Sequence, residues 1–149
     1  MTYSSIFNCC VVELNKIHDR AGNITVIEAW QLPFAFKRIY YLYDVPGGAD
    51  RGGHAHKEMH HLMVAASGSY DVILDDGVNK KVVELNRPNY GLHIPPGIWV
   101  ELINFSSGAI SLNIVSTKYS ESDYIRDYQE FLMIKNKNSI NKKRSLTCL

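Results

Sequence analysis

Short runs of hydrophobic residues, separated by turn residues, follow one another along most of this chain. Runs that are rich in β-branched and aromatic residues and end at Gly, Pro, Asn or Asp predict β-strands. They occupy residues 10–14, 22–29, 36–45, 60–66, 69–74, 81–85, 90–94, 99–105 and 109–116. This pattern predicts about nine strands with no helix between them, which is typical of an antiparallel sandwich or barrel and argues against βαβ units.

The C-terminal part has a different period. Ser120 and Asp123 resemble a capping box, which predicts a helix that begins there. The apolar residues that follow recur at helical spacing and form one face: Tyr124, Ile125, Tyr128, Phe131 and Leu132. Residues 135–149 are polar and basic without an apolar stripe, so we expect a loosely ordered tail after a single domain of residues 1–134.

Composition and charge exclude several classes of partner. The chain has 149 residues, of which 46% are hydrophobic and 21% are charged, as in one ordinary globular domain. The net charge of +1 provides no field that would attract nucleic acid or a membrane surface. No apolar run approaches the roughly 18 residues of a membrane span, and the N-terminus has no signal-peptide pattern. Three cysteines, at Cys9, Cys10 and Cys148, fit reduced thiols in a cytoplasmic protein.

The segment from Gly48 to Gly68 carries most of the candidate chemistry. If its centre is a strand, His54 and His56 point to the same face, because side chains alternate with a period of two. Two imidazoles side by side, with Arg51 just before them, form a compact group for proton transfer or metal binding. The pattern alone leaves both chemistries open.

The same segment has the spacing of the first cupin motif. Its histidine pair and its glycines stand at the usual places, but His61 replaces the usual glutamate. Residues 95–104 resemble the second cupin motif, except that Val100 stands where a metal-binding histidine is expected. Together with the late helical pattern, the resemblance implies an all-β cupin, a double-stranded β-helix (jelly-roll) barrel with one C-terminal helix.

Val100 decides between the two chemistries. His54, His56 and His61 still offer imidazole ligands to a zinc, iron or nickel ion. An aliphatic side chain cannot act as the missing ligand, however, and the charge of Arg51 would oppose a divalent cation. We therefore expect no metal ion and no other cofactor, and we favour acid–base chemistry by histidines that titrate near neutrality.

A narrower resemblance covers nearly the whole chain. Five runs, in the same order, look like those of sugar-nucleotide 3,4-ketoisomerases: residues 36–41, 51–57, 72–77, 91–99 and 122–128. These small cupins form the dTDP-4-keto-6-deoxyglucose 3,4-ketoisomerase family, which is related to the WxcM-like proteins of surface-polysaccharide gene clusters. The resemblance implies an isomerase that needs no metal and forms a homodimer by exchange of N-terminal strands.

The resemblance also implies a reaction. It would convert dTDP-4-keto-6-deoxy-D-glucose to a dTDP-3-keto-6-deoxyhexose through an enediol, on the way to a 3-amino-3,6-dideoxy sugar for a lipopolysaccharide O-antigen. Position by position, the catalytic base of the family is His54 and the second histidine is His56. The family's tyrosine is Tyr40, and the arginine that opens its Arg-Gly motif is Arg51.

The residues themselves fit these roles. Charge develops on oxygen in an enediolate, so a neutral His54 acting as the base needs a donor nearby, such as Arg51 or Tyr40. Tyr40 or His56 could exchange protons between the two sugar oxygens. Arg38 shares the strand face of Tyr40 and could bind a substrate phosphate, because guanidinium pairs with phosphate bidentately.

Two more histidines are candidate substrate-binding residues. On a strand His61 shares the face of His56, whereas His60 points away. His93 precedes a Pro-Pro pair in the hairpin that is expected near the barrel. The alternative functions are an epimerase for a related 4-keto sugar nucleotide, a non-catalytic cupin that binds a sugar nucleotide or a partner chain, and a metal-dependent oxygenase.

Overall fold

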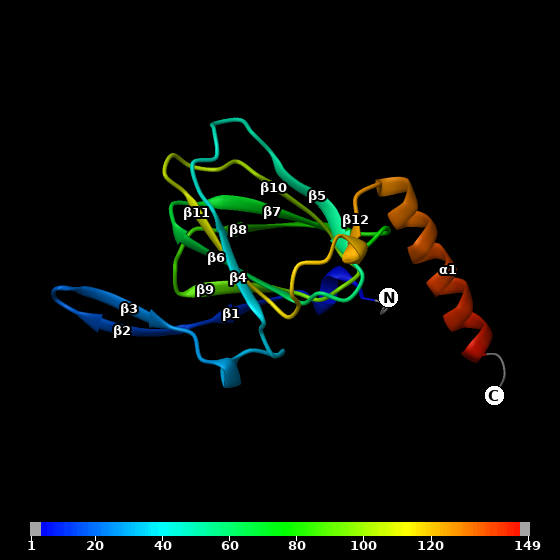
Figure 1. Ribbon diagram of the computed structural model, residues 1–149, viewed down its shortest axis with the longest axis horizontal. Coiled ribbons are helices and arrows are strands. Elements are labelled where there is room, and N and C mark those ends of the chain that lie inside the picture. Colours follow the sequence, from blue (N-terminus) through cyan, green and yellow to red (C-terminus); the bar gives the residue numbers. More distant parts are fainter. Residues whose placement is uncertain (1–3, 147–149) are drawn as a thin grey trace.

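Two five-stranded antiparallel sheets face each other across a shared core (Figure 1). The computed structural model describes residues 4–146, with side chains described for residues 4–140. The strands are β1 (Cys10–Glu13), β2 (Asn15–Asp19), β3 (Gly22–Val26), β4 (Arg38–Leu42), β5 (Arg51–His56), β6 (His61–Ser67), β7 (Tyr70–Asp75), β8 (Lys80–Leu85), β9 (Tyr90–Ile94), β10 (Trp99–Ile103), β11 (Ile110–Val115) and β12 (Tyr124–Ile125). The helices are α1 (Tyr128–Leu146) and the short 3-10 turns Ile6–Asn8, Ala29–Gln31 and Glu121–Asp123.

The strand order explains how distant segments meet. One sheet has the order β1-β9-β6-β11-β4, and the other has the order β12-β5-β10-β7-β8. The remaining strands, β2 and β3, form a separate hairpin that projects away from both sheets (Figure 1). Every pairing between described strands is antiparallel, as the short, closely spaced runs predict.

Alternation along each strand decides which side chains enter the core. On β6, Met63 and Ala65 point between the sheets, and their neighbours Leu62 and Val64 point to the outer face. The segment around Leu32 covers that outer face. Strand β6 is therefore buried on both faces over most of its length, which explains its nearly continuous hydrophobic run.

The all-β cupin prediction is confirmed, and each of the nine predicted runs overlaps a strand. The pattern missed β2, because residues 15–19 are polar except for Ile17 and are exposed throughout, without alternation of burial. It also missed the two-residue β12, which exists only through its pairing with β5. The conditional expectation that His54 and His56 lie on a strand is confirmed by β5.

The helix begins later than its periodicity predicts. Ser120 makes no capping hydrogen bond, and Tyr124 and Ile125 lie in β12. Asp127 caps the helix instead, because its carboxylate accepts the backbone N–H of Glu130 at 2.7 Å. The predicted start is wrong because pairing with β5 satisfies the backbone of residues 124 and 125 in an extended conformation.

The structure continues α1 through residues 135–146, for which the sequence predicts a loose tail. The expected domain end at residue 134 therefore falls inside this helix. Lys135 shows why the helix stays on the barrel: its buried ammonium donates to the backbone carbonyl of Gly97 at 2.8 Å and to that of Ser4. No helix within residues 4–146 is long and apolar enough to cross a membrane. Cys148 lies outside the described residues.

The first turns of α1 are held by an aromatic contact. Phe131 is fully buried, and its ring centroid lies 5.7 Å from that of Trp99 on β10. Ile125 and Ala55 complete this cluster on the outer face of the second sheet. Replacement of Phe131 by a small side chain would leave a cavity between the helix and the sheet.

We expect Phe131→Ala to lower the free energy of unfolding by about 3 kcal/mol, because it removes buried apolar surface and creates a void. Urea unfolding followed by circular dichroism measures the change. Met133→Ala is the matched control, since Met133 lies on the same helix and is 58% exposed. Equal losses for the two variants would show that the buried contact does not hold the helix.

Candidate active site

A cavity of about 510 Å³ opens between strands of both sheets and the segment that precedes α1. Five of the seven predicted site residues line it: Arg38, Tyr40, Arg51, His54 and His61. The other two, His56 and His93, are not part of the lining. His56 lies behind His54, and His93 lies on the outer face of the first sheet.

Strand β4 supplies one wall of the cavity. Arg38, Tyr40 and Leu42 alternate toward the cavity, as the shared strand face predicts, whereas Ile39 and Tyr41 point outward and are exposed. The guanidinium carbon of Arg38 lies 5.3 Å from the ring centroid of Tyr40. This contact places a fixed positive charge beside the phenol.

Strand β5 supplies the opposite wall, and His54 lies directly across from Val100 on β10. The position of a usual cupin metal ligand is therefore occupied by the apolar side chain of Val100, next to His54. Burial lowers the pKa of His54, so the imidazole is neutral at pH 7. Its Nδ1 is buried and has no hydrogen-bond partner among the described residues. A neutral, partly desolvated imidazole at a cavity wall can act as a base.

The backbone beside His54 requires glycine. Gly52 has φ +88°, and a Cβ at this position would lie 2.8 Å from the carbonyl oxygen of Val100. The register between β5 and β10 also shifts here, between Val100 and Glu101. This bulge brings Arg51, which is exposed, to the rim of the cavity.

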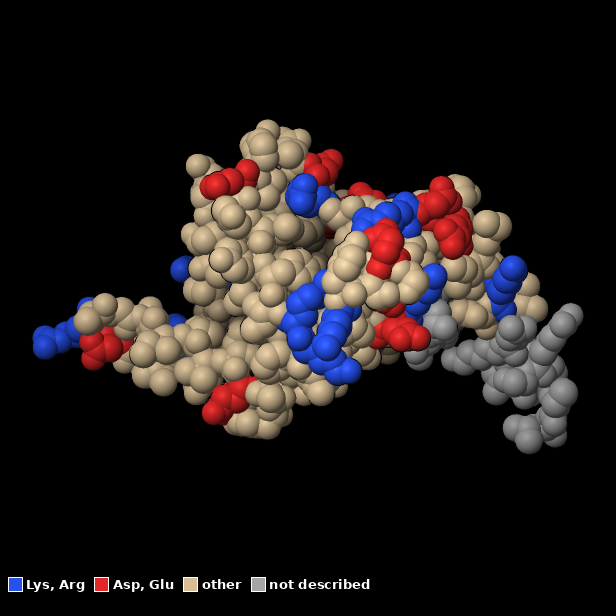
Figure 2. All heavy atoms as spheres, in the orientation of Figure 1, with Lys and Arg blue, Asp and Glu red and all other residues tan. Residues whose placement is uncertain are grey.

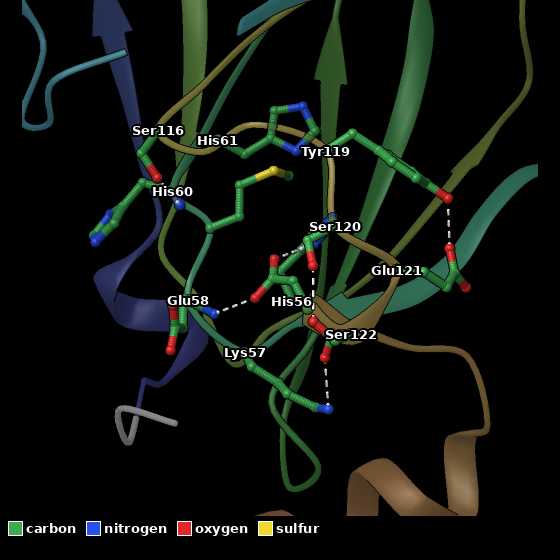
Figure 3. A network of polar contacts seen from close by, with 12 residues as sticks. His56, Lys57, Glu58, His60, His61, Ser116, Tyr119, Ser120, Glu121 and Ser122 are labelled. Carbon is green, nitrogen blue, oxygen red and sulfur yellow. Dashed lines mark hydrogen bonds and ion pairs between the residues drawn. The ribbon is translucent and has the colours of Figure 1, made fainter. Parts of the chain in front are cut away.

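His56 lies behind His54 and is buried. The two ring centroids are 4.9 Å apart, with the rings nearly perpendicular. The Nδ1 of His56 is 2.9 Å from the carboxylate of Asp123, which only accepts, so Nδ1 carries the proton (Figure 3). Asp123 is held in turn by the backbone N–H of Glu58 at 2.8 Å. The other nitrogen of His56, Nε2, is buried without a partner among the described residues.

Burial lowers the pKa of His56, and the neighbouring His54 and Arg38 lower it further. The carboxylate of Asp123 fixes the tautomer of the neutral ring. From the sequence, we expect His56 to exchange protons with the substrate. The structure places the ring of His56 behind His54 and against Tyr124, 4.4 Å between centroids, rather than on the cavity wall.

His61 lies on β6 and is buried at the inner end of the site. Its Nε2 is 2.8 Å from Asn113 Oδ1 and 3.3 Å from the hydroxyl of Tyr40. Burial lowers the pKa of His61 to about 3, so this ring is also uncharged at pH 7. His60 points away from His61, as alternation predicts (Figure 3). Within the described residues no three His, Cys, Asp or Glu side chains are placed to share a metal ion.

His93 is the predicted site residue that the structure places elsewhere. On β9 it is paired with Leu62, and both point to the outer face of the first sheet. Its Nε2 lies 3.2 Å from Nδ1 of His60, and its ring stacks on Phe34. Its neighbours Leu92 and Ile94 point into the core instead. The structure therefore does not place His93 on the cavity wall, because alternation on β9 sends it outward.

Several lining residues were not predicted. Tyr124, which the periodicity assigned to a helix, pairs through β12 with His56 and lies 5.0 Å from the His54 ring. Tyr119 and Arg126 flank it, and Asn113 reaches the cavity from β11. Residues 122–128 belong to one of the runs that carry the family resemblance, so a signal was present in the sequence. The helical spacing concealed it.

The electrostatics of the cavity favour an anionic ligand. Arg38, Arg51 and Arg126 line it together with one carboxylate, that of Asp50. Glu121 forms an ion pair with Arg126 at 2.6 Å, which holds that guanidinium beside the site. Figure 2 shows basic side chains with acidic ones nearby on the face in view, whereas three arginines and one carboxylate line the cavity.

Comparison with known proteins agrees with this site. Residues 7–136 match the family described as FdtA: WxcM-like, C-terminal. The chain is 40% identical over 122 residues to the TDP-4-oxo-6-deoxy-alpha-D-glucose-3,4-oxoisomerase of Aneurinibacillus thermoaerophilus, which covers 81% of this chain and 88% of that protein. A 3,4-ketoisomerase from Helicobacter canadensis shares 42% identity with a TM-score of 0.84, over 87% of this chain and 98% of that chain.

The sugar 3,4-ketoisomerase QdtA from Thermoanaerobacterium thermosaccharolyticum is also similar. Its structure in complex with TDP has 34% identity and a TM-score of 0.87, over 90% of this chain and 98% of that chain. A mutant of the same enzyme was crystallised with TDP-4-keto-6-deoxyglucose. The fold and the site thus define a cupin isomerase. The chain belongs to the FdtA family of WxcM-like proteins and is an enzyme, an isomerase of the sugar-nucleotide 3,4-ketoisomerase class.

The buried histidines make stability depend on pH. The folded-state pKa of His61, about 3, lies below its ordinary value of 6.5, so the unfolded chain binds more protons between these values. We expect the free energy of unfolding to fall as pH decreases below 6.5. This histidine contributes a slope of about 1.4 kcal/mol per pH unit.

Urea unfolding at pH 6.5, 5.5 and 4.5 measures this slope for the native chain and for His61→Gln, which cannot titrate. We expect a shallower slope for the variant. His18→Gln, at an exposed position, is the matched control and should keep the native slope. Identical slopes for the native chain and His61→Gln would contradict the buried neutral state.

Proposed function

We propose that this enzyme converts dTDP-4-keto-6-deoxy-D-glucose to a dTDP-3-keto-6-deoxyhexose by proton transfers alone. One observation carries the proposal: a neutral His54 and the phenol of Tyr40 line one cavity that three arginines also line. The substrates named for the similar enzymes support the sugar nucleotide. An aliphatic Val100 opposite His54 supports chemistry without a metal ion.

The proposed reaction begins at carbon 3 of the sugar. His54 takes the proton from this carbon, and the electrons of the C–H bond form a double bond between carbons 3 and 4. Tyr40 donates its proton to the oxygen on carbon 4, which gives a neutral enediol. Tyr40 then regains a proton from the oxygen on carbon 3, and His54 returns its proton to carbon 4. Atoms and charge balance, and both side chains end as they began.

The arginines have a separate role in this proposal. Arg38 and Arg126 bind the diphosphate of the substrate, because guanidinium groups pair with phosphate oxygens at two points. Arg51, at the rim, stabilises either the sugar oxygen on which negative charge develops or the diphosphate next to it. Remote binding of the diphosphate holds the sugar ring against the acid and the base.

The product suggests a place in a reaction sequence. A keto group at carbon 3 is the substrate that a transaminating enzyme converts to an amine. We therefore propose that the enzyme supplies a 3-amino-3,6-dideoxy sugar for a lipopolysaccharide O-antigen, in the cytoplasm. The two described cysteines, Cys9 and Cys10, are free thiols, as a reducing compartment favours.

We expect His54→Asn to lower kcat by at least about 100-fold, because it removes the base but keeps a side chain of similar polarity. Solvent deuterium incorporated at carbon 3 or 4 of the sugar, followed by NMR, measures proton transfer directly. Binding of TDP by calorimetry should persist, and His60→Asn, which changes a histidine outside the cavity, should keep native activity. A native chain that binds TDP without exchange or turnover would instead indicate a non-catalytic cupin.

We also propose that the enzyme is a homodimer in which N-terminal strands are exchanged. The hairpin of β2 and β3 projects from the sheets and exposes Ile17 and Ile24. The outer face of β4 exposes Ile39 and Tyr41 in addition. Apolar side chains gathered on a surface are typical of an interface, and a second copy would cover them.

We expect sedimentation equilibrium to give the mass of a dimer for the native chain. Replacement of both Ile17 and Ile24 by Asp should shift the mass toward the monomer, because two charges would be buried in the interface. Val78→Asp is the matched control, since Val78 is 84% exposed in the turn between β7 and β8. A native chain that sediments as a monomer would refute the proposed assembly.

A further inference from the structure

His61 is the residue that neither the cupin motif nor the proposed proton transfers explain. It is 4% exposed and lies between Asn113 and Tyr40, at 2.8 Å and 3.3 Å from its Nε2. A buried polar ring in contact with the proposed acid affects the hydrogen bonds that this acid can make. The directions of the surrounding hydrogen bonds determine whether His61 donates to Tyr40 or accepts from it.

The amide of Asn113 is oriented by a group that only accepts. Its Nδ2 is 2.8 Å from the backbone carbonyl oxygen of Ser111 and 3.2 Å from the Ser111 hydroxyl. A carbonyl oxygen cannot donate, so the NH₂ of Asn113 faces Ser111. The Ser111 hydroxyl donates to Tyr70 at 2.8 Å, and both side chains are buried. The amide oxygen of Asn113 must therefore face His61.

That orientation fixes the tautomer of His61. The amide oxygen of Asn113 is an acceptor, so the Nε2 atom at 2.8 Å from it must carry the proton. A protonated Nε2 has no lone pair for another donor. The hydroxyl of Tyr40, 3.3 Å away, can only accept a share of this same N–H, in a three-centre hydrogen bond whose shorter arm goes to Asn113 Oδ1. The hydroxyl proton of Tyr40 is then free to point elsewhere.

We propose that His61 is a positioning residue for the acid Tyr40. As the neutral Nε2–H tautomer it donates to the phenol oxygen, which leaves the phenol proton directed to the substrate and stabilises the phenolate that forms when this proton is given up. The inference rests on the proposed function, since it assigns His61 a role in the same proton transfer. His61 itself neither gives nor takes a proton in the reaction.

The surroundings of His61 support a fixed, uncharged ring. Burial keeps its pKa low, and His56, whose ring centroid is 6.4 Å away, opposes a charge as well. Arg38 lies beside Tyr40 and further disfavours a positive imidazole. A neutral ring in one tautomer provides the same hydrogen bond throughout the reaction.

The first experiment reads the tautomer without any turnover. Long-range proton–nitrogen NMR of the native chain, with His61 assigned by comparison with His61→Gln, distinguishes protonated from unprotonated ring nitrogens. We expect Nε2 to be protonated and Nδ1 to be unprotonated at pH 7. A ring protonated at Nδ1, or at both nitrogens, would overturn the proposal whatever the activity of the enzyme.

The second experiment compares two variants with different donors. His61→Gln keeps an N–H donor near the position of Nε2, whereas His61→Leu keeps the volume without a donor. We expect His61→Leu to lower kcat by at least about 10-fold with little change in KM, and His61→Gln to recover most of this loss. His60→Gln is the matched control on the outer face and should keep the native kcat.

The outcomes separate the two proposals. A native chain that does not isomerise dTDP-4-keto-6-deoxy-D-glucose contradicts the proposed function, and the NMR result still decides the tautomer. In an active enzyme, a His61→Leu variant with native kcat, or a His61→Gln variant no better than His61→Leu, overturns the positioning role. Thermal unfolding and TDP binding identify a variant that is simply misfolded. If His61→Leu is misfolded, the NMR result and the kcat of His61→Gln decide the positioning role.

Discussion

The pairing of β5 between β10 and β12 is the constraint on which the site depends. It fixes His54 opposite Val100 and His56 opposite Tyr124, so both imidazoles face the same interior. The same pairing turns Ala55 to the outer face, where it packs against α1. One strand thus connects the interior of the candidate site with the helix that covers the sheet, and neither can shift without the other.

Desolvation gives the site its chemistry. Burial lowers the pKa of His54, His56 and His61, so the interior contains neutral imidazoles rather than cations. The positive charge of the cavity comes from arginines, which stay charged at any physiological pH. Bases and charges are therefore carried by different residue types. This separation places neutral imidazoles and fixed positive charges in one cavity.

Much of the fold was readable because each strand alternates or runs hydrophobic in the way its burial requires. The site was readable where a local period decides the outcome, as for the faces of Arg38 and Tyr40 and of His54 and His56. His93 shows the limit of that reasoning. Alternation gives two faces, and only the position of β9 in the sheet tells which face is inside. Tyr124 shows another limit, because pairing with β5 outweighs a helical spacing.

The sequence by itself determined the class of fold, the histidine pair and the loss of the usual cupin metal ligand at Val100. These properties depend on residue type and short spacing. Only the tertiary structure decided that His56 lies behind His54 on the carboxylate of Asp123, and that His61 lies within 3.3 Å of the hydroxyl of Tyr40. The first contact joins residues 67 positions apart, and the second joins residues 21 positions apart. Both follow from strand order, which no local period encodes.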